Sequence, residues 1–457
     1  MRRVLLVCGL VLFLLPASLS STTSSVFRIR WQIQLQNPGY TDAQDVVATI
    51  LVFDNRSGWV NQQVLWEDIP GEVLRNADNR IAIFRVPRLR AGRTESISFE
   101  QLVKVDRTEL DLDLSRGTYI PPECLSFTLP IDHLWENHPD LVSKAAELCE
   151  NVATPVEKLR RIFEFVKDYL TYRPQAEERG ALWAYRNRVG DCTEFTNLLI
   201  ALCRLSGIPA KFVSAVGYSR EKANDLYSMG HAFALVYLPG LEWVPVDATW
   251  SSPRGELGIS SEDKLVMLVS DGWNLLKDSG ITVPKDRVNY SYVGTDPGVR
   301  LLSQATILKE VGLEVSLDAA GELRDSTWEW YVTVRNVGSV TVNNLSVRLS
   351  ADNEIFEIPP PVTLDELPGG HNKVFTLEVR VKRSAENLPV VAEVEYETPY
   401  GVFSAKAEAK ASPTLYESPL SGLEKYFAAM RSFLAEHSLF VLLVLVGMAG
   451  ILLARRF

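Results

Sequence analysis

Cysteine and histidine are scarce in this chain of 457 residues, which has five of each. Cys8 lies in an apolar stretch near the start, which leaves Cys124, Cys149, Cys192 and Cys203 for the rest of the sequence. Four cysteines are too few to hold a chain of this length together as a disulfide scaffold, although one bridge between Cys124 and Cys149 is possible.

An excess of basic residues is also absent. The chain has 47 Lys and Arg against 57 Asp and Glu, a formal net charge of −10, and no basic cluster reverses that balance. Nucleic acid and anionic membrane surfaces attract proteins through positive charge, so neither is expected as the main partner.

Metal-binding spacings are missing as well, because the sequence contains no His-Glu-x-x-His and no Cys-x-x-Cys. His133 and His138 lie near Asp132, Glu136 and Asp140, and a metalloprotein built on these five residues is the weaker alternative. We expect no metal and no cofactor.

Long hydrophobic runs occur at the two ends of the sequence. Residues 1–20 combine two arginines, an apolar stretch and small residues after Pro16, which is typical of a secretory signal peptide. Residues 438–454 form an apolar run near the lower limit of roughly 17 residues for a membrane helix. Arg455 and Arg456 follow, and positive flanks stay in the cytoplasm. We therefore expect a single-pass cell-membrane protein whose body is extracellular, with residues 418–437 as a helical stalk.

Between the ends, the hydrophobic pattern divides the chain into three parts. Residues 26–128 alternate apolar and polar side chains, which predicts an N-terminal β-sandwich-like domain. Residues 133–300 begin with helical periodicity and continue with strands, as in an α+β domain. Residues 313–411 alternate again and predict a C-terminal β-sandwich. The sequence thus predicts a multidomain α+β protein.

Cys192 stands at the start of a predicted helix in the central part. In the segment "GDCTEFTNLLIALCRLSG", apolar residues recur every three or four positions, and Gly207 is expected to end an amphipathic helix. A cysteine at a helix N-terminus is favoured as the thiolate, which is the nucleophilic form. Cys203 lies roughly 16 Å further along the helix axis and is expected to be a buried apolar residue.

His231 and Asp247 follow at the two ends of a predicted hairpin. The segment "GHAFALVYLPGLEWVPVDATW" indicates two strands that turn at Pro239 and Gly240. Because an antiparallel hairpin places the start of one arm beside the end of the other, His231 and Asp247 should be neighbours. A thiol nucleophile needs an imidazole to accept its proton and a carboxylate to hold the imidazole. Cys192, His231 and Asp247 are therefore the candidate catalytic residues.

These motifs resemble the transglutaminase-like superfamily, a papain-like cysteine fold. The resemblance rests on Gly190-Asp191-Cys192, on His231-Ala232, and on Trp243 to Asp247 as Trp-Val-Pro-Val-Asp, in that order. It implies Cys192 as nucleophile, His231 as general base and acid, and Asp247 as the orienting carboxylate. Two positions depart from the family pattern: Phe233, where many members have Trp, and Ala248, where many have Pro. No calcium-binding segment of the animal enzymes is matched, so calcium dependence is not implied.

The implied reaction is acyl transfer on a protein or peptide amide, and water or an amine remains open as the acceptor. The backbone N–H of Cys192 is one expected oxyanion donor, and Trp183, Tyr172 or Gln175 is a candidate for the second. Trp243 is expected in the wall of the site or in the core, and Asp191 as a helix cap. The alternative from another class is an inactive surface protein that uses the core and the sandwiches for binding. The sequence leaves the oligomeric state open.

Overall fold

The computed structural model describes residues 23–76, 79–250, 255–272, 286–319, 323–324 and 327–413. The predicted signal peptide (1–20), stalk (418–437) and membrane helix (438–454) lie outside these ranges. Among the described residues, no helix has the length and apolar character needed to cross a membrane.

The first β region consists of two four-stranded antiparallel sheets with alternating burial. In β1 (Ser24–Gln36), the side chains of Ile29, Trp31, Ile33 and Leu35 are buried and those between them are more exposed. The strand orders are β17-β1-β6-β3 and β16-β2-β5-β4, and both sheets contribute to one hydrophobic cluster. The remaining bounds are β2 (Ala43–Val52), β3 (Asn61–Glu67), β4 (Glu72–Asn76), β5 (Asn79–Leu89), β6 (Thr94–Asp106), β16 (Arg287–Tyr292) and β17 (Arg300–Val311).

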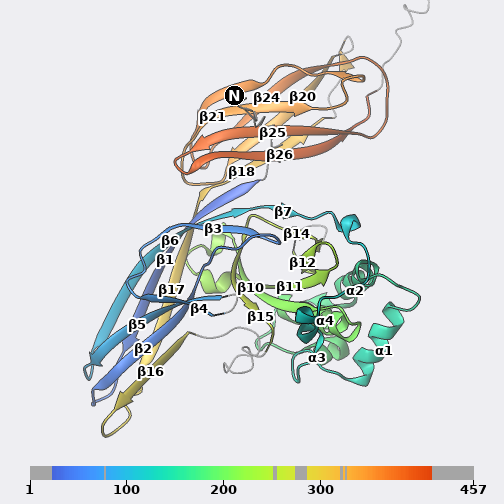
Figure 1. Cartoon of the computed structure of the whole chain (residues 1–457). Helices are drawn as coiled ribbons and strands as arrows, with labels where there is room; N and C mark the ends of the chain where they lie inside the picture. Colours follow the sequence, from blue (N-terminus) through green and yellow to red (C-terminus); the bar gives the residue numbers. More distant parts are fainter. Residues whose placement is uncertain are drawn as a thin grey trace, which may run out of the picture.

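The strand β16 does not belong to the region where the sequence boundaries placed it, and β17 lies almost wholly in the gap between those boundaries. The sequence assigned residues up to 300 to the central domain and began the next at 313, but β17 pairs with β1 and β16 pairs with β2. Residues 287–311 therefore complete the first β region (Figure 1). Alternation of apolar and polar residues identifies a strand but does not show which sheet the strand joins. The sequence pattern therefore could not show that residues 287–311 pair with strands of the first β region.

Among its described residues, the central region contains one five-stranded antiparallel sheet and the helices α1 to α4 (Figure 1). The strand order is β13-β12-β11-β10-β15. The strands are β10 (Ala210–Gly217), β11 (Gly230–Leu238), β12 (Glu242–Asp247), β13 (Glu256–Leu257) and β15 (Lys264–Ser270). The helices are α1 (Pro139–Leu148), α2 (Pro155–Tyr169), α3 (Ala181–Asn187) and α4 (Cys192–Leu205).

Short elements connect these pieces. Two two-stranded pairs form, β7 with β14 and β8 with β9. Their bounds, with those of the 3₁₀ turns, are β7 (Thr108–Glu109), η1 (Leu112–Leu114), η2 (Pro122–Thr128), β8 (Thr171–Tyr172), β9 (Val189–Gly190), η3 (Arg220–Lys222), η4 (Leu226–Met229) and β14 (Ile259–Ser260).

The central sheet is buried on both faces. Ala234 and Val246 belong to the hydrophobic cluster of the helices, whereas Val213, Phe233 and Leu235 belong to the cluster of the first β region. This double burial explains why β11 is almost continuously apolar, since a strand covered on one face alone would alternate. The first β region therefore supplies the second covering layer of the central sheet.

Helix α4 is enclosed on all sides, which corrects the expectation of an amphipathic helix. All residues from Thr193 to Arg204 are buried, including polar ones. Asn197 accepts a hydrogen bond from Trp135 Nε1 (2.9 Å), and the Arg204 guanidinium donates to the carbonyl oxygen of Ala210 (2.7 Å). Polar side chains with such hydrogen-bond partners can be buried at little cost in free energy. The polar side of α4 is therefore buried as well, although the sequence pattern predicted that it would be exposed.

The C-terminal β region also has two sheets around one cluster. Their orders are β18-β20-β24-β22, with β19 paired to β20, and β23-β21-β25-β26. The strands are β18 (Leu313–Asp318), β19 (Leu323–Arg324), β20 (Thr327–Asn336), β21 (Val342–Ser350), β22 (Phe356–Glu357), β23 (Val362–Leu367), β24 (Asn372–Val381), β25 (Leu388–Thr398) and β26 (Gly401–Ala411). Only Gly312 separates β17 from β18, so the last strand of the first β region continues directly into this one.

Candidate active site

Cys192 is the first residue of α4, and local hydrogen bonds fix this helix start. The Asp191 side chain accepts from the backbone N–H of Thr193 (3.0 Å), and Glu194 Oε2 accepts from the N–H of Asp191 (2.8 Å). The two bonds form a capping box. Asp191 is thus a cap, as expected, and it holds the cysteine in the first turn of the helix.

Gly190 is required by the close approach of Glu194. A Cβ atom at position 190 would lie 2.2 Å from Glu194 Cβ, which is shorter than any normal contact between two carbon atoms. Glu194 is fully buried and also accepts from the N–H of Arg179 (2.8 Å), and burial raises its pKa to about 7. Gly190 and Asp191 of the Gly-Asp-Cys motif therefore each have a structural reason, and together they place Cys192 at the start of α4.

The structure brings His231 and Asp247 together. His231 Nε2 lies 2.7 Å from Asp247 Oδ2, and the two side chains are 9% and 1% exposed. The register of the β11–β12 hairpin pairs Ala234 with Val246, which makes His231 and Asp247 diagonal neighbours on one face of the sheet. Trp250 packs beside the imidazole with ring centroids 4.8 Å apart.

Asp247 is held as a carboxylate by several donors. Its Oδ1 accepts from the backbone N–H groups of Thr249 (3.0 Å) and Trp250 (3.1 Å) and from the Thr249 hydroxyl (3.0 Å). Burial would raise the pKa of Asp247, but the charges of His231 and Lys264 and these hydrogen bonds hold it well below its usual range. Asp247 can orient the imidazole without taking its proton.

His231 is correspondingly favoured in its charged form. Burial acts to lower the pKa of the imidazole, but the charge and hydrogen bond of Asp247, together with the interaction with Cys192, raise it to about 9. Because Nε2 is engaged by Asp247, Nδ1 is the ring nitrogen left for the thiol.

Cys192 and His231 line one cavity of about 390 Å³. Its walls include Gln175 and Glu178 from the segment before α3, Tyr227 from η4, and Leu51 from β2 of the first β region. Of the three candidates for a second oxyanion donor, Gln175 lines this cavity, whereas the lining given by the described residues includes neither Trp183 nor Tyr172. The site therefore lies between the central domain and the first β region.

Other residues singled out in the sequence have structural positions. Trp243 packs edge-on against Phe127 and Tyr237, away from the cavity that holds Cys192. Phe233 and Ala248, which depart from the family pattern, are both buried in hydrophobic clusters.

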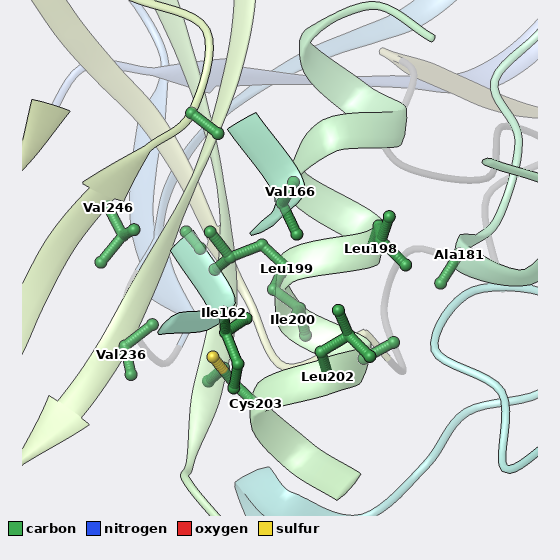
Figure 2. Close-up of a cluster of buried hydrophobic side chains, with 14 of the residues drawn as sticks. Ile162, Val166, Ala181, Leu198, Leu199, Ile200, Leu202, Cys203, Val236 and Val246 are labelled. Atoms are coloured by element: carbon green, nitrogen blue, oxygen red, sulfur yellow. The ribbon is translucent and has the colours of Figure 1, made fainter. Parts of the chain in front are cut away.

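The remaining cysteines do not form a bridge. Cys124, Cys149, Cys192 and Cys203 are all free, so the pairing considered between Cys124 and Cys149 is not formed. Cys149 Sγ instead lies 3.2 Å from the hydroxyl of Ser206. Cys203 is buried among Leu199, Leu202 and other apolar side chains, as expected (Figure 2).

The residues of the weaker metal alternative include His138 and Asp140, which have other partners. His138 caps α1 by accepting from the N–H of Asp140, and Asp140 pairs with Arg186 (3.0 Å). In the part of the chain that the structure describes, no group of three or more His, Cys, Asp or Glu side chains is placed to hold a metal ion.

Sequence reasoning missed Lys264 and Glu256. Lys264 Nζ lies 3.1 Å from Asp247 Oδ2 and 2.7 Å from Glu256 Oε2, and its side chain is completely buried. Neither residue belongs to a motif, and Lys264 opens a strand, where a lysine is ordinarily a solvated residue. No signal in the sequence marks the pair.

Residues 142–248 match the family described as the transglutaminase-like superfamily. No curated protein matches the sequence. Among solved structures, the chain is similar to a proposed cysteine protease from Cytophaga hutchinsonii, at 17% identity and a TM-score of 0.42, over 62% of this chain and 98% of that one.

It is also similar to red sea bream transglutaminase, at 9% identity and a TM-score of 0.23, over 86% of this chain and 80% of that one. A third similar structure is a proposed protease from Parabacteroides distasonis, at 11% identity and a TM-score of 0.23, over 77% of this chain and 69% of that one. The family match shows that this chain contains a transglutaminase-like domain at residues 142–248.

Proposed function

We propose that the chain is a cysteine-dependent acyl-transfer enzyme that acts on protein or peptide amides through Cys192, His231 and Asp247. The observation that carries the proposal is the cavity that Cys192 and His231 share, with Asp247 hydrogen-bonded to the far side of the imidazole. These two observations support a series of thiol, imidazole and carboxylate, as a nucleophile and its base require.

In the proposed reaction, His231 Nδ1 accepts the thiol proton of Cys192 and the thiolate attacks the amide carbon. The tetrahedral oxyanion collapses, the C–N bond breaks, and His231 returns the proton to the leaving amine. The acyl thioester on Cys192 is then cleaved by water or by a second amine, whose proton passes to His231. Asp247 stabilises the imidazolium at each stage and stays ionised, in agreement with its lowered pKa.

The oxyanion needs hydrogen-bond donors beside the attacked carbon. The backbone N–H of Cys192 lies in the first turn of α4, where helical N–H groups have no partner within the helix. Gln175 is the proposed second donor because it lines the cavity. Its side-chain amide donates to the carbonyl oxygen of Arg173 (2.8 Å) and has a second N–H that could reach the substrate.

The test is incubation with a glutamine-containing protein and a labelled primary amine, read by mass spectrometry for amine incorporation against cleavage. Cys192→Ala and His231→Ala should each abolish turnover, whereas Asp247→Ala should keep a small fraction of the activity. Cys203→Ala is the control and should stay active with a modest loss of stability. A reaction that survives Cys192→Ala, or one lost in Cys203→Ala with Cys192→Ala active, would contradict the assignment.

We further propose that the enzyme is a single-pass membrane protein with its body outside the cell, on the strength of residues 1–20, 438–454 and the two arginines that follow. Protease added to intact cells should then degrade the body. Truncation before Ser438 should release a soluble, folded protein into the medium. A body that resists protease until the membrane is opened would contradict this placement.

A further inference from the structure

A buried lysine lies directly behind the proposed triad. Lys264 opens β15, and its Nζ donates to Asp247 Oδ2 (3.1 Å), the same oxygen that His231 Nε2 contacts at 2.7 Å. On its other side, Nζ donates to Glu256 Oε2 (2.7 Å). The exposed fractions of the Lys264 and Glu256 side chains are 0% and 6%.

The fold builds this arrangement from the four strands β10, β12, β13 and β15. β13 pairs Glu256 with Asp247, and β10 pairs Gly217 with Lys264. Gly217 is required here because a Cβ atom would lie 2.6 Å from the ring of Trp250, which packs against His231. Lys264 Nζ also lies 5.5 Å from the centre of the Trp250 ring. The lysine is thus fixed by two carboxylates and by an aromatic ring.

We propose that Lys264 and Glu256 are positioning residues that set the charge acting on the His231–Cys192 pair, so that thiolate and imidazolium coexist near neutral pH. This proposal rests on the proposed function, because it assigns a role within the same triad. The negative charge of Asp247 favours the imidazolium of His231. The positive charge of Lys264 disfavours the imidazolium, and the negative charge of Glu256 offsets part of the effect of Lys264. Charges interact strongly here because the groups are buried.

The other ionisable groups around His231 are Cys192 and Asp191 at the start of α4, Asp247 at the end of β12, and Glu178, Tyr227 and Asp286 in the cavity wall. Of these groups, Asp247 contacts Lys264 directly, and His231 and the backbone N–H groups of Thr249 and Trp250 still hold it as a carboxylate when Lys264 is neutral. Opposite substitutions at the two positions should therefore move the ionisation of the pair in opposite directions. A buried ion pair with a purely structural role would change stability without this reversal.

The test measures the rate of iodoacetamide alkylation of Cys192 against pH in the full chain. Alkylation is followed by mass spectrometry of the peptide that contains Cys192, so that the other free thiols, Cys124, Cys149 and Cys203, do not contribute. Lys264→Met removes a positive charge, which makes loss of a proton harder for the thiol and for the imidazolium alike, so the profile should move to higher pH by about one pH unit. Glu256→Gln removes a negative charge and should move it to lower pH by a similar amount. The double variant Lys264→Met/Glu256→Gln restores the net charge and should return the profile close to that of the parent.

Glu256→Gln decides the outcome if Lys264→Met does not fold, because glutamine has nearly the same shape and keeps an acceptor for Nζ. A folded Glu256→Gln protein with an unmoved profile would overturn the proposal, as would single-variant shifts in the same direction. His231→Ala separates this result from the proposed function. If the profile depends on His231 but not on Glu256 or Lys264, only the positioning role fails. If it does not depend on His231, the proposed pair itself fails.

Discussion

At the scale of single residues, the protonation of His231 links the site to the stability of the fold. The side chain is 9% exposed, and its pKa is about 9 in the folded protein against an ordinary value near 6.5. A group whose pKa is raised by folding contributes stability that is fully present below the unfolded value and is lost as pH rises through the folded value. The contribution of His231 should therefore disappear between about pH 6.5 and 9.

This prediction compares Cys192→Ala with Cys192→Ala/His231→Gln, so that the thiol does not titrate. Asp247 remains as the main group that raises the pKa of His231 in the first variant. Because the contribution of Cys192 to the raised pKa of His231 is removed in both variants, the window starts at about pH 6.5 and closes below pH 9. Within it, the difference in the free energy of unfolding between the two variants should fall with pH, at up to about 1.4 kcal/mol per pH unit. Urea denaturation at several pH values measures it. A difference that stays constant from pH 6 to 10 would mean that folding does not favour the imidazolium.

At the scale of elements, the start of α4 places the nucleophile, and Gly190 is its most sensitive position. Gly190→Ala would place a Cβ atom 2.2 Å from Glu194 Cβ, so the capping box must distort. We expect a loss of about 1–3 kcal/mol in stability, as for overpacking in a core, together with slower alkylation of Cys192. Thermal unfolding and iodoacetamide kinetics measure the two effects.

Gly230→Ala is the matched control, because this glycine directly precedes His231 and borders the cavity, but a Cβ atom there would meet only Tyr227 O at 3.4 Å. Its cost should stay below about 1 kcal/mol, within the range of ordinary surface changes. Equal effects of the two alanines would show that crowding at Glu194 does not position Cys192.

The elements also show what the sequence could predict. The α2 and α4 starts and the β11–β12 hairpin depend on residues a few positions apart, so their signals are local and visible in the sequence. Thr154 caps α2 by accepting from the backbone N–H of Glu157, three residues further on. The environment of α4 was mispredicted because α1, α2 and β11, which pack against it, are separated from it in the sequence. Lys264 was missed for the same reason, since a lysine carries no mark of a distant carboxylate.

At the scale of the whole molecule, the three regions are joined by contacts that no sequence pattern indicates. Arg28 of β1 forms ion pairs with Glu310 of β17 and with Glu100 of β6. Tyr400, from the C-terminal β region, donates its hydroxyl to the same Glu310. The first β region also buries one face of the central sheet. The sequence does not indicate this contact, because the pattern of a strand shows that a face is apolar but not what covers it.

That shared layer leads to a prediction about fragments. A fragment of residues 133–300, the central domain bounded by sequence alone, would expose Val213, Phe233 and Leu235, which the first β region covers in the full chain. Exposed apolar surface of this kind favours aggregation over cooperative folding.

A fragment of residues 23–312 keeps both β16 and β17 and the covering sheets, and it contains every group placed at the site. We expect the longer fragment to be monomeric, to unfold cooperatively and to keep the alkylation profile of Cys192, whereas the shorter one should aggregate or lack a cooperative transition. Size-exclusion chromatography and thermal unfolding followed by near-UV circular dichroism distinguish the two. A shorter fragment that folds as cooperatively as the longer one would show that the central sheet does not need the first β region.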